Sequence, residues 1–253
     1  MDSSEHDRTV DAILRAVWDG QEGNQSPAQI THRCEYCQKA FKRERTLEAH
    51  MCEKKRRWLR KDEKDVQFGF RAFQLFYRLA VNSSKEKGIK DFIHSQYYGD
   101  FVTYGTFLVA NNVQPADKYT EYLIKQGTKL NQWYKDTTLE KWIKVYTKTE
   151  SVERGIERSV MNLQRWADDN QCEWTDFFDR VGGGRVVHMF RTGKLSPWIV
   201  YTCDAFQRVL DRMNDEQLQL IAEYIDPAHW IDRTNKERDS VQWAEQIWRS
   251  AGV

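Results

Sequence analysis

The chain has 253 residues and a mass of 30.2 kDa, and its 39 Lys and Arg nearly balance 38 Asp and Glu. This balance excludes a protein that is basic over its whole surface, and an apolar fraction of 40% excludes disorder of the whole chain. No apolar run approaches the roughly 20 residues that span a bilayer, and the first residues lack a signal sequence. We therefore expect a soluble, unexported protein without membrane association.

Residues 7–18 are predicted to form a short helix, because five apolar residues recur at helical spacing and make one stripe. The stripe consists of Val10, Ile13, Leu14, Val17 and Trp18. Residues 19–27 contain no apolar side chain and are rich in Gly, Asn and Gln, which predicts a flexible linker. Two uses of the helix remain open: it docks onto the rest of the chain, or it binds a partner.

Three of the five cysteines lie in one short stretch, which in an unexported protein indicates a metal site rather than disulfides. Residues 34–50 read C-x2-C-x3-F-x5-L-x2-H. This pattern resembles the C2H2 zinc finger, a ββα unit around one tetrahedral zinc. Two residues between Cys34 and Cys37 let one turn direct both sulfurs at one ion. Phe41 and Leu47 would fill a core too small to fold without the metal, so the sequence predicts bound Zn2+.

The fourth ligand departs from the family pattern, in which three to five residues follow the first histidine. Here Cys52 follows His50 after a single residue. Positions two apart on a helix point to nearly opposite faces, so the helix must end or tighten at His50 if both are to reach the ion. The predicted ligands are Cys34, Cys37, His50 and Cys52. His32 is a weaker candidate, and packing is the favoured role for it because the family normally has an aromatic residue there.

The resemblance implies that four positions on the finger helix face DNA bases. These are Arg43, Arg45, Thr46 and Ala49. Arg43 is the one that could donate two hydrogen bonds to guanine. One finger covers only about three base pairs, so a specific site would need further contacts.

A basic segment follows the finger directly. It contains Lys54, Lys55, Arg56, Arg57, Trp58, Arg60 and Lys61. Cations interrupted by a tryptophan predict a segment that tracks phosphates and offers a stacking ring. Residues 33–61 hold eleven Lys and Arg against four Glu, a net charge of +7 that leaves −6 for the rest. Two alternatives remain open: a protein-binding finger, and a structural role in which the cations form the solvated face of a connecting helix.

The remainder of the chain is predicted to be all-α or nearly so, because its dense apolar residues follow helical spacing. Helical spacing covers 66–79 and 92–108, and Pro115 suits a first helical turn. Further helices are expected near 138–147, 152–168, 172–180, 204–213, 215–224 and 240–250. Asn214 and Gln217 form a capping pair. Residues 185–201 predict either a hairpin or short helices.

No motif in this helical part predicts catalysis. Residues 181–185 are rich in glycine but lack the Lys-Ser/Thr pair of a phosphate loop, so we expect a turn there. His94, His188 and His229 have no metal-type spacing, and no His-Glu-x-x-His element exists. We therefore expect no enzyme. A metal-dependent nuclease assembled from scattered carboxylates remains an alternative.

Several short motifs follow one another along the chain. They are the His-x-Cys ending of the finger with residues 53–58, then residues 95–101, 157–159, 196–198 and 226–230. In this order they resemble zinc-finger proteins of T4-like tailed phages. The resemblance implies the cytoplasm of an infected bacterial host as the setting, with virion association as an option, and it supplies no activity.

The sequence therefore predicts a mainly α protein in three segments: an N-terminal helix and linker (1–29), a ββα finger with its basic extension (30–61), and a helical domain (62–253). The leading hypothesis is a phage accessory protein whose finger and basic segment contact DNA or RNA. Its helical domain would contact a phage or host protein. The main alternative is a protein adaptor or virion assembly factor with a structural finger, and the third is a nuclease.

Overall fold

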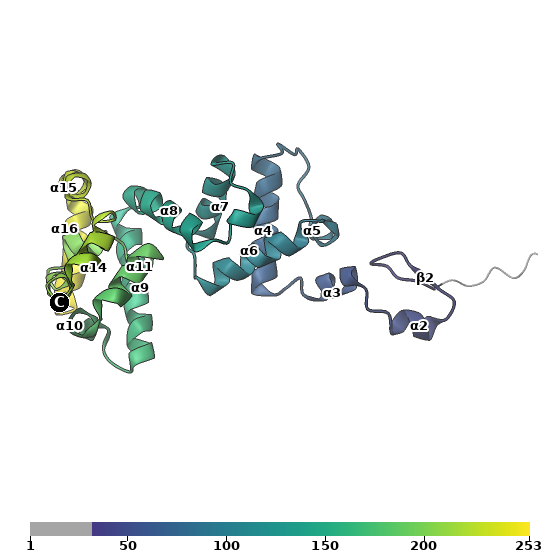
Figure 1. The fold of residues 1–253 in the computed structure, drawn as a ribbon, viewed down its shortest axis with the longest axis horizontal. Coiled ribbons are helices and arrows are strands. Elements are labelled where there is room, and N and C mark those ends of the chain that lie inside the picture. Colours follow the sequence, from purple (N-terminus) through teal and green to yellow (C-terminus); the bar gives the residue numbers. More distant parts are fainter. Residues whose placement is uncertain (1–31) are drawn as a thin grey trace, which may run out of the picture. The chain divides into compact units, whose positions relative to one another are not determined.

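The computed structural model describes residues 32–253, which fall into two compact units (Figure 1). We call residues 32–59 the finger unit and residues 60–253 the body. Both contain helices, and the strands of the described residues form one two-stranded sheet in the finger unit. The predicted fold class, mainly α with a small ββα unit, is confirmed. The helix predicted at 7–18 and the linker after it lie outside the described residues.

The finger unit begins with two short antiparallel strands, β1 (His32–Arg33) and β2 (Ala40–Phe41), in which His32 pairs with Phe41. Two helices follow, α2 (Glu44–Glu48) and α3 (Glu53–Leu59). Helix α2 ends before His50, with Ala49 as its C-terminal cap. The break predicted from the His-x-Cys spacing is thus present.

The first part of the body centres on two helices that cross closely, α4 (Lys64–Leu79) and α6 (Tyr98–Ala110). Gly69 and Gly105 lie at the crossing, where backbone of the opposite helix occupies the space of a side chain. Helices α5 (Ile89–His94) and α7 (Ala116–Lys125) complete this part. Its interior is aromatic: the Phe101 ring lies 5.5 Å from Phe73 and 5.8 Å from Trp133.

The second part of the body is a series of further helices and 3-10 turns. They are η1 (Leu130–Gln132), α8 (Asp136–Tyr146), η2 (Thr147–Thr149), α9 (Val152–Asn170), η3 (Trp174–Asp176), α10 (Phe177–Arg180), α11 (Gly183–Arg191), α12 (Trp198–Thr202), α13 (Phe206–Leu210), α14 (Asp215–Ala222), α15 (Pro227–Lys236) and α16 (Arg238–Ser250). The capping pair predicted at α14 is confirmed, because the Asn214 side chain accepts from the Gln217 N–H and Gln217 Oε1 accepts from the Asn214 N–H. Within the described residues, no helix combines the length and apolarity needed to cross a membrane.

The stretch at 185–201 resolves into helices, α11 and α12, rather than a hairpin. The turn predicted at 181–185 is wrong beyond Gly182, because Gly182 caps α11 and Gly183 is its first residue. The reason is burial: α11 buries four apolar side chains, and packing of that face outweighs the low helix propensity of glycine. The buried residues are Val186, Val187, Met189 and Phe190.

A buried carboxylate, Glu150, is a polar centre of the body. Its side chain is 1% exposed and forms a bidentate ion pair with Arg158, with 2.7 Å between Nη2 and Oε2. Ser196 Oγ donates to the same carboxylate over 3.1 Å, and Trp198 Nε1 donates to the Glu150 carbonyl over 3.2 Å. The Arg158 and Ser196 donors replace water around the buried carboxylate, and Trp198 does so at the backbone carbonyl.

Helix α15 closes this centre from another side. The Arg233 guanidinium lies 4.6 Å from the Trp198 ring and 5.6 Å from the Trp230 ring, and it donates to the Glu150 carbonyl over 3.0 Å. Two motifs of the phage resemblance, at 157–159 and 196–198, thus contribute Arg158 and Ser196 to this carboxylate, and Trp230 of a third motif, at 226–230, packs 4.9 Å from the Trp198 ring. In this structure side chains of these motifs pack in the interior of the body.

Candidate metal centre

The structure brings the four predicted ligand side chains together. The ligand atoms of Cys34, Cys37, His50 and Cys52 all lie within 4.8 Å of one another. The Cys34 and Cys52 sulfurs are 3.9 Å apart, and the Cys37 sulfur is 3.3 Å from His50 Nε2. Within residues 32–253 this is the one group of three or more such side chains that converges in this way. His32 is not part of it.

These spacings fit a tetrahedral metal ion. Zinc with Zn–S bonds of about 2.3 Å separates two thiolate sulfurs by about 3.8 Å, close to the distance between Cys34 and Cys52. Three thiolates and one imidazole are ligands typical of a closed structural zinc site. The four side chains therefore form a cluster that could hold a metal ion, and the donor set favours zinc.

A tight turn between the strands positions the first pair of cysteines. The Cys34 N–H donates to the Lys39 carbonyl over 3.0 Å, and the Gln38 N–H donates to the Cys34 carbonyl over 2.8 Å. Gln38 adopts a left-handed conformation with φ of 63°, which reverses the chain directly after Cys37. Both sulfurs consequently face the same side of the turn.

The junction between α2 and α3 positions the second pair. His50 follows α2, and its ring lies 4.7 Å from that of Phe41. Cys52 directly precedes α3, where the Lys55 N–H donates to its sulfur over 3.4 Å. Lys55 Nζ also donates to the His50 carbonyl over 3.5 Å. Sequence reasoning missed this structural role of Lys55. Its position three residues after Cys52, at the start of a helix, was the available signal.

The thiols influence one another. Burial raises the pKa of the Cys34 thiol, but the N–H groups of Cys37 and Tyr36 and the neighbouring sulfurs bring this pKa below its ordinary value. The Lys39 N–H lowers the pKa of Cys37, but burial and the neighbouring sulfurs of Cys34 and Cys52 raise it above its ordinary value. Deprotonation of a second thiol is therefore opposed by the negative charge of the first thiolate. A divalent cation between them would remove this repulsion.

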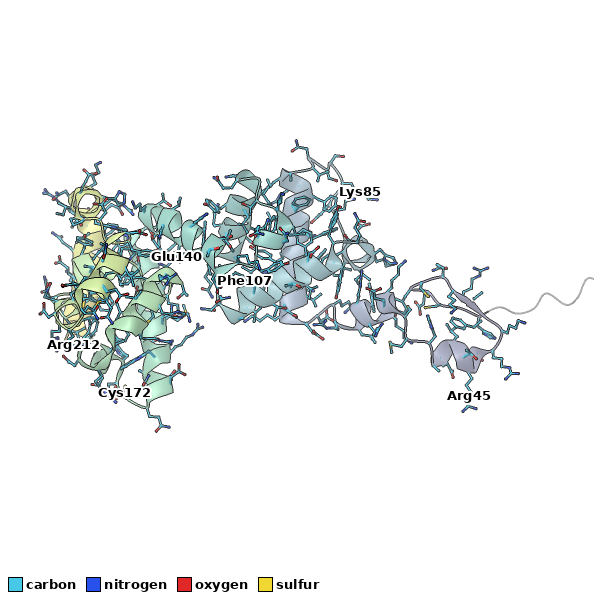
Figure 2. All side chains as sticks on the ribbon, viewed as in Figure 1. Arg45, Lys85, Phe107, Glu140, Cys172 and Arg212 are labelled. Carbon is cyan, nitrogen blue, oxygen red and sulfur yellow. The ribbon has the colours of Figure 1, made fainter. Side chains whose placement is uncertain are left out.

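The positions that the resemblance assigned to base contact lie around a very short helix. Arg43, Arg45, Thr46 and Ala49 are all exposed, and Figure 2 shows the Arg45 side chain extending away from the finger ribbon. Only Arg45 and Thr46 belong to α2, because Arg43 caps its start and Ala49 its end. The finger thus lacks the long helix that carries base contacts in the family it resembles.

The basic segment forms α3 and the turn after it. Arg57 is ion-paired with Glu53, and Arg60, the first residue of the body, is paired with Glu63 over 2.7 Å. The Trp58 ring lies 6.2 Å from the Tyr36 ring. The remaining predicted contact residues are Lys54 and Lys55, which are half-buried, and Arg56, which is exposed.

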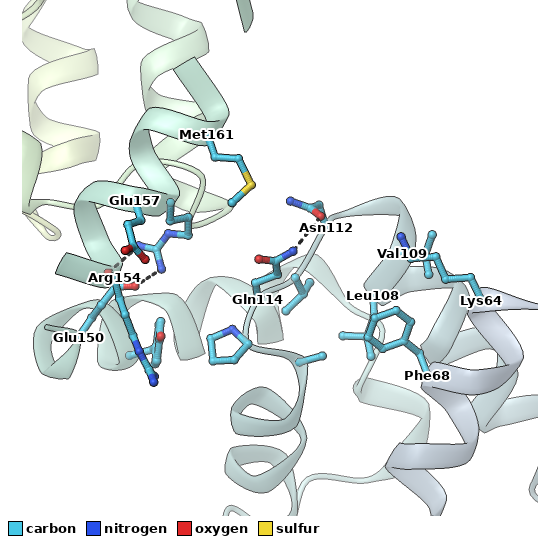
Figure 3. Close-up of a pocket in the computed structure, with 15 residues that line it drawn as sticks. Lys64, Phe68, Leu108, Val109, Asn112, Gln114, Glu150, Arg154, Glu157 and Met161 are labelled. Carbon is cyan, nitrogen blue, oxygen red and sulfur yellow. Dashed lines mark hydrogen bonds and ion pairs between the residues drawn. The ribbon is translucent and has the colours of Figure 1, made fainter. Parts of the chain in front are cut away.

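A hollow of about 510 Å³ lies in the body, with Glu157 and Met161 of α9 on one wall and Phe68 of α4 on another (Figure 3). Its most buried charge is Glu150, which Arg158 already neutralises. A metal-dependent nuclease gathers carboxylates around its metal. Among the residues that the structure describes, the carboxylates that line this hollow form no such group.

Comparisons with known proteins identify no relative. No protein-family model and no curated protein matches the sequence, and no solved structure matches the fold. Function is therefore inferred from the residues of the cluster and from the charges around it.

Proposed function

We propose that this chain is a zinc-binding accessory protein whose finger unit contacts nucleic acid. The observation that carries the proposal is the convergence of Cys34, Cys37, His50 and Cys52 within 4.8 Å, next to a chain segment rich in cations. Bound zinc would neutralise the thiolates and supply folding energy to a unit with almost no core. The cations that surround it would contact phosphates.

Zinc binding is tested by the metal content of the purified chain, with about one zinc per chain expected. Cys52→Ala removes the ligand that departs from the family pattern and should lower zinc affinity. The matched control is Cys172→Ala, a half-buried cysteine of the body outside the cluster. If Cys52→Ala keeps the full zinc affinity, the fourth ligand is assigned wrongly.

Nucleic-acid binding is tested by fluorescence anisotropy of the zinc-loaded chain with duplex and single-stranded probes over a series of salt concentrations. We expect binding that weakens steeply with salt, because each neutralised phosphate releases a counterion. The triple variant Arg43→Ala, Lys55→Ala and Arg57→Ala should weaken it further. Absence of binding at low salt, or unchanged affinity in the triple variant, would refute the proposal.

One observation favours the alternative of a protein-binding finger. Met51 is 50% exposed and Leu59 is 61% exposed, so two apolar side chains of the finger unit face solvent. In this alternative the chain is an adaptor or assembly factor. Either function would operate in an infected bacterial cell, as the resemblance to phage proteins implies, and the body would bind a phage or host protein.

A pulldown from infected cells, performed with and without nuclease, separates the two functions. Recovery of phage proteins that disappears after nuclease treatment supports a contact made through nucleic acid. Recovery that survives both nuclease and moderate salt supports the adaptor. The variant Met51→Ser/Leu59→Ser should then reduce recovery without changing the zinc content.

A further inference from the structure

We infer that the finger unit contacts the phosphates of double-helical nucleic acid through Lys42, Arg43 and Arg45, and that it reads no base sequence. The inference rests on the proposed function and makes it more specific. It moves the main contact away from the basic segment at 54–61, which has the higher charge density in the sequence. Three features of the structure support it: ion pairing, the length of α2, and the surroundings of Trp58.

Half of the cations in the basic segment already have carboxylate partners. The ion pairs are Arg57–Glu53, Arg60–Glu63 and Lys61–Asp62. A fourth cation, Lys55, directs its ammonium group to the His50 carbonyl. A phosphate that approaches this segment must compete with groups already in place, so each of these cations gains less from it than a solvated cation would.

The cations at the start of α2 have no carboxylate partner among the described residues. Lys42, Arg43 and Arg45 are exposed, and none has an ion pair with another described residue. Arg43 immediately precedes α2 and Arg45 lies in its first turn, so the three are neighbours along the chain. No carboxylate of residues 32–253 compensates their charges, so a phosphate backbone can replace the counterions around them.

The length of α2 argues against base reading. Its five residues extend for only about 7.5 Å, whereas a recognition helix presents base-contacting residues over about two turns inside the major groove. Glu44 and Glu48 are also exposed on this helix. If α2 entered a groove, both carboxylates would approach phosphates. Contact along the backbone avoids that repulsion and carries no sequence information.

The surroundings of Trp58 favour a duplex over a single strand. Proteins that hold single strands stack unpaired bases on open aromatic rings. Trp58 is only half-exposed, and its ring is already packed 6.2 Å from that of Tyr36. A duplex, whose bases are stacked inside it, requires no such ring.

The test compares two double variants that remove the same charge. Arg43→Ala/Arg45→Ala removes cations without ion pairs, and Arg57→Ala/Arg60→Ala removes paired ones. Binding of the zinc-loaded chain to a mixed-sequence DNA duplex, an RNA duplex and single-stranded DNA is measured over a salt series. The first variant should lower the salt slope by about two on the duplexes, and the second by less than one. Scrambling the duplex sequence should leave the affinity unchanged.

Zinc content confirms that the finger unit of each variant is folded, and thermal unfolding does so for the body. Arg57→Gln/Arg60→Gln replaces the second variant if that variant loses metal. Equal effects of the two variants, or a larger effect of the paired cations, would overturn the inference while leaving nucleic-acid binding intact. Tighter binding to the single strand, or to one duplex sequence, would also overturn the inference and leave nucleic-acid binding intact. If the wild-type chain binds no probe at low salt, the proposed function fails and the inference fails with it.

Discussion

Cys34 is the one buried residue among positions 32–59, whereas the body buries entire tryptophans, with Trp133, Trp198 and Trp230 at 1% exposure or less. The finger unit has two strands of two residues each and helices of five and seven. So little apolar burial cannot offset the chain entropy of folding. Ligand bonds to a metal held by the cysteine and histidine cluster would supply the missing stability, whereas the body buries enough apolar surface without one.

The two units also differ in what compensates the charge of their acidic side chains. In the finger unit, the Lys39 N–H lowers the pKa of Cys37, but burial and the neighbouring sulfurs of Cys34 and Cys52 raise it above its ordinary value, and a bound cation would offset this effect. In the body, the buried Glu150 carboxylate has its cation, Arg158, on the same chain. The finger should therefore respond to metal supply and the body should not.

The largest expected effect comes from two equally buried cysteines, one in each unit. Cys34 and Cys203 are both 3% exposed. Cys34→Ala should abolish zinc binding and unfold the finger unit completely, because a ligand is lost. Cys203→Ala should keep one zinc per chain and destabilise the body by about 1 kcal/mol, because only a small cavity forms. Zinc content, thermal unfolding and finger-unit NMR signals check both.

Chelation of the wild-type chain gives the same comparison without a mutation. Finger-unit NMR signals should collapse to unfolded positions while the melting temperature of the body is unchanged. If chelation also shifts that melting temperature by several degrees, the two units do not fold independently, and the comparison is wrong.

A smaller effect is expected from the ion pair inside the body. Arg158→Ala leaves the Glu150 carboxylate buried without its cation, which should cost about 3–5 kcal/mol of unfolding free energy. The control is Arg180→Ala, because the side chains of the Arg180–Asp176 pair are 55% and 44% exposed and such pairs contribute less than about 1 kcal/mol. Urea unfolding measures both, and neither variant should change the zinc content. Similar losses in the two variants would show that burial of the pair is unimportant.

Local patterns predicted the features that depend on local geometry. The spacing from Cys34 to Cys52 predicted the metal cluster, since a turn, a hairpin and a short helix fix where those residues point. The helix break at His50 followed from the same geometry. The pair Asn214 and Gln217 predicted a cap because both partners lie within one turn.

Features that depend on distant partners were not predictable in this way. Glu150 accepts hydrogen bonds from Ser196 and Trp198, which lie 46 and 48 positions further along the chain. No pattern near Glu150 in the sequence predicts these partners. The sequence predicted a turn at the start of α11 and left the rest open between a hairpin strand and a short helix, and packing of its apolar face in the core favours the helix. The carboxylate partners of Arg57 and Arg60 are nearby in sequence, but which cations pair depends on where α3 begins and ends.

The smallest expected effect concerns two glycines of the same helix, α6. A Cβ on Gly105 would lie 1.9 Å from the Asp65 carbonyl oxygen of α4, and backbone cannot rotate away as a side chain can. Gly105→Ala should therefore force α4 and α6 apart and cost roughly 1–3 kcal/mol. A Cβ on Gly99 meets nothing within 4 Å, so Gly99→Ala should be neutral or stabilise the helix by up to about 1 kcal/mol. Opposite signs in urea unfolding would show that the body depends on close contact between helices, which the finger unit lacks. If Gly105→Ala leaves the free energy of unfolding unchanged, α4 and α6 can move apart at little cost. The packing difference between the two units would then be smaller than the structure indicates.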